Sequence, residues 1–362
     1  MRNFILSVLF LGLSSPVFAQ NPSPFLTLPN IEQLSANTDF SEAWQAWQAK
    51  DYIKARILAA QSGANGESAG QLLFGILLDK GLGGDQDPQN AVRWYREAAT
   101  NGETDAWLAL AGMAFEQRGG LSVSDGRQFL QNAANENSPE AMWALGQIFA
   151  SGHGGPLDEK QAEFWFTAAI NKGVNPARIS LADLYLAQDK PEQALRLYQT
   201  AAFGGSAEAA WKAGVLQADP ESVVYAPKKA NQHLLTAAQS GDSQAMTAYG
   251  LFLAGRTPPL PASAARWFRK AAEASHAEGQ YLFALSLAKG EGIEEDRELA
   301  YEWALRAMMN VRLRPEYREL ANALAQELPA SVRDMAHARS KMPLLISHAT
   351  DPGGIDRLKA AD

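Results

Sequence analysis

The sequence contains no cysteine among its 362 residues. This absence excludes disulfide bridges, thiolate metal sites and cysteine nucleophiles, so packing alone has to stabilise the fold. Histidine is also scarce, and its five copies, at positions 153, 233, 276, 337 and 348, include no two at metal-ligand spacing on one helix. His153 stands between Gly152 and Gly154 and is expected to be an exposed loop residue.

Positive charge is in short supply too, because 32 Lys and Arg face 40 Asp and Glu, for a net charge of −8. Phosphate backbones repel an acidic chain, so nucleic acid is excluded as the partner. The sequence also lacks the HExxH, GxSxG, Walker A and Rossmann glycine patterns. It therefore predicts a non-enzymatic protein with no catalytic, metal-binding or cofactor-binding residue and no cofactor. A glycan hydrolase with carboxylates paired across a cleft is the weaker alternative.

Long apolar runs are confined to the N-terminus. Arg2 precedes the apolar stretch Phe4–Leu13, and a small-x-Ala cleavage site ends at Ala19. The stretch is shorter than the roughly 20 residues that span a bilayer, so an uncleaved anchor is the lesser alternative. The sequence predicts a Sec-type signal peptide over residues 1–19. It also predicts a periplasmic or secreted mature protein without an integral membrane segment.

What the chain has instead is an internal repeat. Three units place a small residue 19 positions before a tryptophan: Gly75 and Trp94, Gly146 and Trp165, Ala284 and Trp303. The first alanine after the tryptophan position recurs along the whole chain, at 59, 98, 133, 168, 201, 237, 271 and 307, at intervals of 33 to 39 residues. Such a period is typical of stacked supersecondary units, each of which buries its apolar face only against its neighbours.

The first half of each unit reads as an amphipathic helix. In the unit 70–102, apolar residues such as Leu73 and Ile76 follow helical spacing. Gly75 has no side chain, so a partner helix can approach closely there. Gly81 predicts the end of this helix, because glycine accepts the left-handed conformation of a C-terminal cap.

The second half reads as a second helix. Asp87 is expected to cap its N-terminus, and Pro88 suits its first turn. Ala91, Trp94 and Ala98 then form a stripe at three- and four-residue spacing. This stripe predicts tight packing, with core positions for the tryptophans 94, 165, 267 and 303.

These residues resemble the Sel-like repeat, a relative of the tetratricopeptide repeat. The shared pattern is A-x3-L-G-x5-G-x-G-x3-D-x3-A-x2-W-x3-A-A-x2-G. The resemblance implies an all-α, right-handed α/α superhelix, a solenoid of helix-turn-helix repeats used for protein–protein interaction. It also implies a role common among bacterial members, that of a periplasmic or secreted adaptor. This chain departs from the pattern at Gly126, which replaces an alanine. In the seventh unit, Pro258–Pro261 replaces the Gly-x-Gly loop.

The predicted organisation follows from the repeat. An extended lead-in covers residues 20–39. Residues 40–312 form about seven helix pairs and a degenerate first pair. Residues 313–342 add two capping helices, which shield the last repeat. Residues 343–362 are a tail.

One column of residues on the first helices is the candidate binding surface. In tetratricopeptide-like stacks these helices line the concave face, and aromatic residues dominate interface energetics. The column lies three residues before the small residue of each first helix and includes Leu72, Leu108, Trp143, Ile179, Trp211 and Tyr281. Packing within the stack and contact with a partner both remain open for these side chains.

The sequence thus predicts a protein–protein interaction adaptor of the bacterial envelope, which binds a protein or peptide on the concave face. The alternative is a secreted effector that binds a host protein. Retention in the periplasm favours the first, and appearance in the culture medium favours the second.

Overall fold

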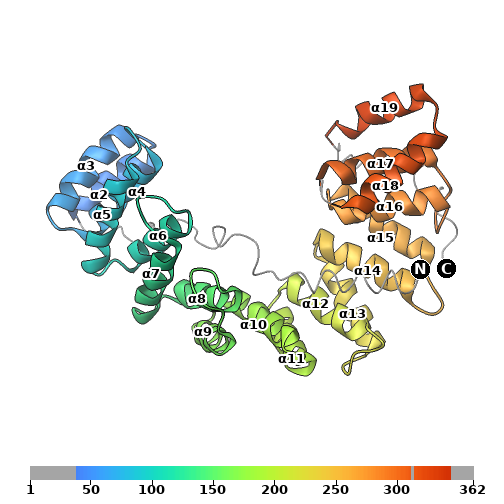
Figure 1. The fold of residues 1–362 in the computed structure, drawn as a ribbon, viewed down its shortest axis with the longest axis horizontal. Coiled ribbons are helices and arrows are strands. Elements are labelled where there is room, and N and C mark those ends of the chain that lie inside the picture. Colours follow the sequence, from blue (N-terminus) through green and yellow to red (C-terminus); the bar gives the residue numbers. More distant parts are fainter. Residues whose placement is uncertain (1–37, 311–313, 344–362) are drawn as a thin grey trace. The chain divides into compact units, whose positions relative to one another are not determined.

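The computed structural model describes residues 38–310 and 314–343 (Figure 1). The predicted signal peptide, most of the lead-in and the tail from residue 344 lie outside the described residues. Within them the chain forms eighteen α-helices and no β-strand. Consecutive helices pack as pairs, which confirms the predicted all-α solenoid of helix-turn-helix repeats.

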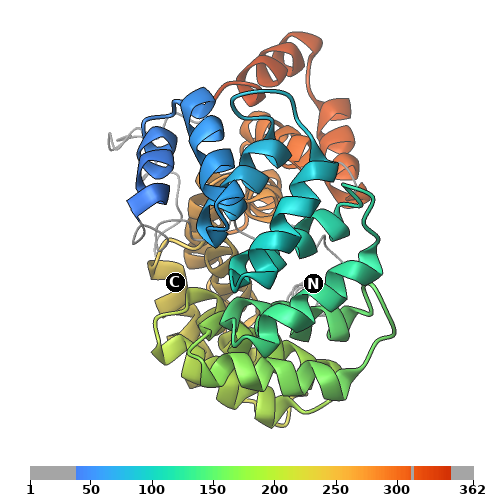
Figure 2. The same cartoon turned by 90° about the vertical axis from the view of Figure 1, so that its left-hand side faces the viewer.

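The contacts between residues divide the described chain into two compact units. The boundary between them along the sequence lies between residues 184 and 185, inside α10. The helices of the N-terminal unit appear from blue to green in Figure 2 as a succession of neighbouring rods. They are α2 (Thr38–Gln48), α3 (Tyr52–Ala64), α4 (Ser68–Lys80), α5 (Pro88–Thr100), α6 (Thr104–Phe115), α7 (Val123–Asn135), α8 (Pro139–Ser151), α9 (Glu159–Asn171) and the first part of α10 (Asn175–Ala187).

The C-terminal unit continues the same alternation of first and second helices. It contains the end of α10 and then α11 (Pro191–Phe203), α12 (Ala207–Ala218), α13 (Pro227–Gln239), α14 (Ser243–Gly255), α15 (Pro261–Glu273), α16 (Ala277–Lys289), α17 (Arg297–Asn310), α18 (Pro315–Glu327) and α19 (Ala330–Ser340). The last two helices occupy the segment expected to cap the stack, and α19 packs on α17.

Aspartates begin several of the second helices, as predicted for Asp87. The Asp87 side chain accepts a hydrogen bond of 3.0 Å from the backbone N–H of Asn90, and Pro88 opens α5. Asp158 caps α9 in the same way, and Asp296 accepts from the N–H of residue 299 at 2.9 Å. Each cap satisfies a backbone donor that has no partner inside its helix.

The two glycines of the Gly-x-Gly loop are each required for a different physical reason. Gly81 ends α4 at φ 66°, the left-handed conformation predicted for it. Gly83 also has a positive φ, and a Cβ there would lie 2.1 Å from the carbonyl oxygen of Tyr52. The loop therefore packs directly on the start of α3, the second helix of the preceding pair. The equivalent Gly292 approaches Pro261, at the start of α15, equally closely.

Two helix glycines accommodate the aromatic residues that follow Trp94 and Trp165. A Cβ on Gly146 would lie 2.3 Å from the ring of Phe166, and Gly75 faces Tyr95 at 2.7 Å. Phe166 is fully buried, and Tyr95 is only 2% exposed. The core position predicted for the tryptophans holds for 165 and 303, but those at 94 and 267 are half-buried. The residue after the tryptophan points towards the glycine of the partner helix. It is therefore buried more deeply than the tryptophan itself.

The prediction that His153 is an exposed loop residue was wrong. Its side chain is half-buried instead of exposed, and its Nε2 atom is buried with no hydrogen-bond partner. The ring centroid lies 5.4 Å from that of Phe115, at the end of α6. Gly154 explains the burial, because it lets this loop approach the carbonyl oxygen of Val123 at the start of α7.

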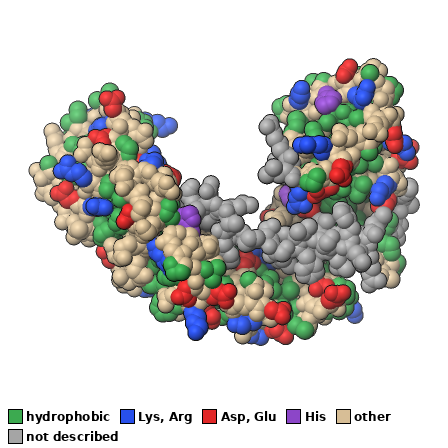
Figure 3. Space-filling model, in the orientation of Figure 1, with side chains coloured by type: hydrophobic (Ala, Val, Ile, Leu, Met, Phe, Trp, Pro, Cys, Tyr) green, Lys and Arg blue, Asp and Glu red, His purple; other side chains and the backbone are tan. Residues whose placement is uncertain are grey.

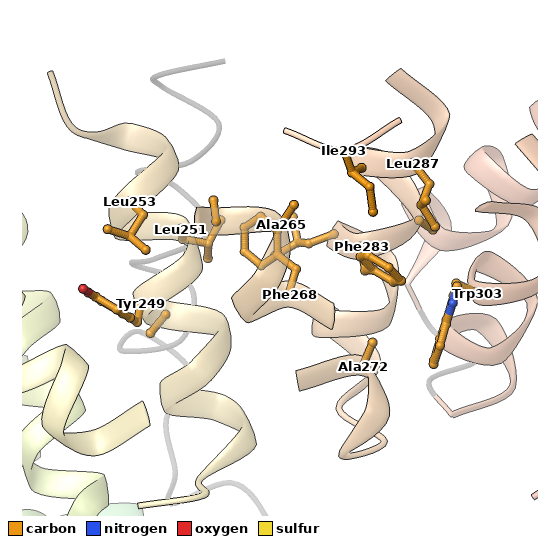
Figure 4. Close-up of a cluster of buried hydrophobic side chains, with 14 of the residues drawn as sticks. Tyr249, Leu251, Leu253, Ala265, Phe268, Ala272, Phe283, Leu287, Ile293 and Trp303 are labelled. Carbon is orange, nitrogen blue, oxygen red and sulfur yellow. The ribbon is translucent and has the colours of Figure 1, made fainter. Parts of the chain in front are cut away.

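In the C-terminal unit, the core runs without a break from α12 to α19. Figure 4 shows part of it, where Leu251 of α14 and Phe268 of α15 point towards each other. Further along, Phe283 of α16 lies against Trp303 of α17, with ring centroids 5.7 Å apart. Each helix pair thus completes the core of the previous pair.

Candidate functional site

The predicted binding column divides into buried and partly exposed members. Four of its side chains are 0 to 8% exposed and offer a partner almost no surface: Leu72, Leu108, Ile179 and Trp211. Trp143 and Tyr281 are half-buried and keep part of their surface. The side chains that remain candidates for partner contact are therefore one tryptophan in the N-terminal unit and one tyrosine in the C-terminal unit.

Trp143 joins two first helices of the N-terminal unit. Its indole N–H donates a hydrogen bond of 3.0 Å to the hydroxyl oxygen of Ser180, so α8 and α10 are tied at this point. The polar edge of the ring is satisfied within the stack. Trp143 can offer a partner only its apolar face.

Tyr281 forms part of the wall of a pocket in the C-terminal unit. The pocket has a volume of about 570 Å³ and opens between the first helices α14 and α16. Its lining is mostly apolar and consists of Leu251, Ala254, Pro259, Pro261, Phe268, Tyr281, Leu282, Leu285, Ser286, Lys289 and Glu291. This volume lies in the range of about 300–1,000 Å³ that is typical of ligand pockets.

The floor of the pocket is part of the core. Leu251, Phe268 and Leu282 are each no more than 6% exposed. Phe268 reaches the floor because Gly250 has no side chain, and a Cβ there would lie 2.5 Å from the ring. The pocket therefore rests on rigid helix packing.

One side of the pocket is built where the sequence departs from the repeat. Pro259 and Pro261 line the pocket and belong to the proline segment that replaces the Gly-x-Gly loop of the seventh unit. Sequence reasoning found this departure but did not connect it with a pocket. The floor residues carry no sequence signal beyond ordinary core periodicity.

Tyr281 is held firmly at its end of the pocket. Its ring stacks on that of Tyr317 in α18, with centroids 4.8 Å apart and planes at 26°. Burial raises the pKa of Tyr281, and the carboxylates of Glu316 and Glu319 raise it further. The phenol therefore stays protonated at neutral pH and is available as a hydrogen-bond donor.

A half-buried carboxyl group, that of Glu278, lies one helical turn before this tyrosine. Burial raises the pKa of Glu278, while the Arg314 guanidinium opposes the shift. Lys289 is exposed at the rim of the pocket, and Glu291 is half-buried beside it. The apolar pocket thus carries both signs of charge at its mouth. On the visible surface in general, acidic and basic side chains are interspersed (Figure 3).

The N-terminal unit carries a group of carboxylates near a second tryptophan. Glu136 accepts hydrogen bonds from the Trp107 indole N–H at 2.9 Å and from the Thr104 hydroxyl at 2.7 Å. Burial, together with Asp105 and Glu136, raises the pKa of Glu103 to about 7. These hydrogen bonds join the end of α7 to the start of α6.

Two further kinds of feature were absent from the described residues. No three His, Asp or Glu side chains within residues 38–310 and 314–343 gather closely enough to hold a metal ion. Among the helices of this part of the chain, none combines the length and apolarity needed to cross a membrane.

Comparison with protein families agrees with this helix-pair architecture. The Sel1 repeat family matches residues 68–103, 139–174, 180–205, 243–276 and 277–309. This chain is a Sel1 repeat protein. The Sel1 match omits residues 104–138, yet α6 and α7 form an ordinary helix pair there, with Gly126 packed under Phe115.

Solved structures and curated proteins are also similar to this chain. A Sel1 repeat protein from Oxalobacter formigenes covers 85% of this chain and 94% of its own, with a TM-score of 0.65 at 23% identity. Chitin synthase regulatory factor 3 of Schizosaccharomyces pombe is 28% identical over 130 residues, and factor 4 is 26% identical over 153. The chain spans only 14% and 22% of the lengths of these two yeast proteins. Sel1 repeat proteins generally mediate protein–protein interaction.

Proposed function

We propose that this Sel1 repeat protein is an adaptor of the bacterial envelope, and that it binds a segment of a partner protein in the pocket between α14 and α16. The observation that carries the proposal is the open apolar pocket with Tyr281 in its wall. The pocket lies on first helices, the face that tetratricopeptide-like stacks use for their ligands. The envelope location rests on the signal peptide predicted for residues 1–19.

The lining of the pocket suits an aliphatic or aromatic side chain of a peptide. Burial of one Leu, Ile or Phe side chain contributes about 1.5–3 kcal/mol. Tyr281 is preorganised by its stacking on Tyr317, so its immobilisation costs little on binding. Lys289 at the rim offers a charge to the polar groups that flank such an anchor.

Photo-crosslinking in intact cells tests the proposal. A benzophenone amino acid at Lys289, on the rim, is expected to capture a specific protein. The same group at Phe203, which is 97% exposed at the end of α11, serves as the control position. The adduct at position 289 is expected to disappear in Leu285→Glu, which puts a charge into the pocket. It is expected to persist in Leu157→Glu, because Leu157 is 57% exposed in the N-terminal unit.

Two results count against the proposal. One is the absence of any specific adduct at position 289 in a folded protein. The other is an identical set of adducts at positions 289 and 203, which is the pattern of random collision. Fractionation of the same cells distinguishes an envelope adaptor from a secreted effector that binds a host protein.

A further inference from the structure

Besides a partner protein, the C-terminal continuation of the same chain is a candidate occupant of this pocket. The described chain ends at Pro343, directly after α19, and the sequence continues for 19 residues. Two apolar residues, Ile355 and Leu358, stand three positions apart in the sequence of that continuation, a spacing that would put both on one face if the segment docked as a helical turn. We infer that residues 355–358 dock into the pocket between α14 and α16 and compete there with the partner segment. The competition rests on the proposed function, whereas the docking does not.

The point where the chain leaves the fold is fixed close to the pocket. The Arg306 guanidinium of α17 donates to the carbonyl oxygens of Arg339 at 2.6 Å and Met342 at 3.0 Å. The carboxylate of Glu302 also accepts a hydrogen bond of 3.2 Å from Arg306. Both Nη atoms of this guanidinium therefore have hydrogen-bond partners. The end of α19 is therefore clamped onto α17.

Arg306 is next to the cluster that holds the pocket wall. Ala307 packs with Tyr317 in one small buried cluster, and Tyr281 packs against the same cluster. The clamp and the pocket wall thus lie about two helix spacings apart, or roughly 20 Å. In Figure 1 the helices α16, α17, α18 and α19 lie together at this end of the chain.

The length of the continuation selects the docking segment. Ile355 lies twelve positions after Pro343. A linker of that length has a typical end-to-end distance of about 20 Å and a maximum of about 40 Å. This reach matches the span to the pocket. The apolar residues 344–346 come too early, because three extended residues reach only about 10 Å.

The charged residues at the mouth of the pocket also favour docking of residues 355–358. Lys289 and Glu291 line the mouth of the pocket, and neither forms an ion pair with another described residue. Asp356 and Arg357 lie between the two apolar anchors, and Lys359 follows them. One docked turn therefore brings an acidic group for Lys289 and a basic group for Glu291.

A linker of matching length gives an effective concentration in the millimolar range. Docking is therefore substantial even when the intrinsic dissociation constant of the segment is about 1 mM. Partner affinity falls by the fraction of pockets that the segment occupies. Ile355→Asp with Leu358→Asp is accordingly expected to raise partner capture at position 289 about two- to tenfold.

Disulfide trapping in the full chain tests the docking directly, because the sequence contains no cysteine that would interfere. The test pair is Leu285→Cys with Ile355→Cys. The first control pair moves the partner cysteine to the exposed surface, as Phe203→Cys with Ile355→Cys. The second control pair, Leu285→Cys with Leu345→Cys, moves the tail cysteine. Thermal denaturation of each reduced variant establishes that it folds.

The expected result is an intramolecular disulfide that forms at least tenfold faster in the test pair than in either control, as measured by mass spectrometry of the linked peptides. Equal rates in the test pair and the surface control overturn the docking. A faster disulfide at position 345 overturns the choice of segment, and predominant disulfides between two chains assign the pocket to a second copy. Trapping without any partner adduct at position 289 leaves the docking in place and counts against the proposed function alone.

Discussion

Gly146→Ala offers the sharpest test of how the helix pairs are packed. The new methyl group would lie 2.3 Å from one carbon of the Phe166 ring and 2.5 Å from another. Carbon atoms normally approach to about 3.5–4.0 Å, so the overlap exceeds 1 Å. Phe166 has no exposed surface and its ring lies in the packed interior, so it has little room to move aside.

The magnitude follows from two opposing effects. Overpacking of a core costs about 1–3 kcal/mol, and an overlap of this size belongs at the upper end. Replacement of a helical glycine by alanine stabilises by about 0.5–1 kcal/mol. The free energy of unfolding is therefore expected to fall by about 2 kcal/mol.

A double-mutant cycle with Phe166→Ala isolates the contact. Phe166→Ala alone is expected to cost about 3–5 kcal/mol. In that background the ring is gone, so Gly146→Ala is expected to change sign and stabilise by about 0.5–1 kcal/mol. The coupling energy between the two positions is then about 2.5–3 kcal/mol.

Urea denaturation followed by far-ultraviolet circular dichroism measures all four proteins of the cycle. The denaturant dependence has to remain equal among them, because repeat stacks lose cooperativity when one unit becomes weak. The reasoning is refuted if the two substitutions are additive within about 0.5 kcal/mol, or if Gly146→Ala stabilises the parent protein.

Three further predictions concern other layers of the structure. Trp165→Ala is expected to destabilise by about 3–5 kcal/mol, and a loss below about 1 kcal/mol in the same denaturation assay would contradict its 9% exposure. Asp79→Asn is expected to cost about 1–3 kcal/mol, because the Asp79 carboxylate of α4 is almost fully buried against the guanidinium of Arg118, which follows α6. A melting temperature unchanged by this substitution would show that the ion pair contributes nothing. Burial and neighbouring carboxylates raise the pKa of Glu103 from an ordinary 4.5 to about 7, so the folded state binds a proton that the unfolded state releases. Its contribution to stability is complete below pH 4.5 and is lost as the pH rises through 7. Glu103→Gln is therefore expected to raise the melting temperature at pH 8 and to leave it unchanged near pH 4.5, and equal effects at both pH values would refute this assignment.

Local chemistry explains why the helix boundaries could be predicted. Asp87 and Pro88 act within one turn of α5, and Gly81 acts within the last turn of α4. These residues satisfy or release backbone groups close to themselves, so their effect hardly depends on the rest of the fold. The same pattern at a constant spacing is sufficient to establish a stack of helix pairs.

Burial was harder to predict, because it depends on neighbouring helices. Trp94 and Trp165 occupy equivalent positions in the repeat, yet Trp94 is half-buried and Trp165 is 9% exposed. Trp94 packs edge-on against Phe74, whereas Trp165 packs edge-on against Phe164. A repeat position therefore fixes which face of a helix a residue occupies, while the particular side chains around it decide how deeply it is covered.

The candidate site shows the same limit. Tyr281 was selected by its register, together with Leu72 and Trp211, which are buried. Nothing in the register distinguished Tyr281 from the other two residues, because the pocket that Tyr281 lines is also framed by the proline segment around Pro259.

By itself, the sequence determined the helix pairs, their number and their caps, because these depend on the spacing of small, apolar and capping residues along one chain. Only the tertiary structure decided that Phe166 fills the space above a glycine and that Leu251 and Phe268 form the floor of an open pocket. Those outcomes depend on the shapes of side chains from three successive helices, and shape complementarity across helices leaves no periodic trace in a single sequence.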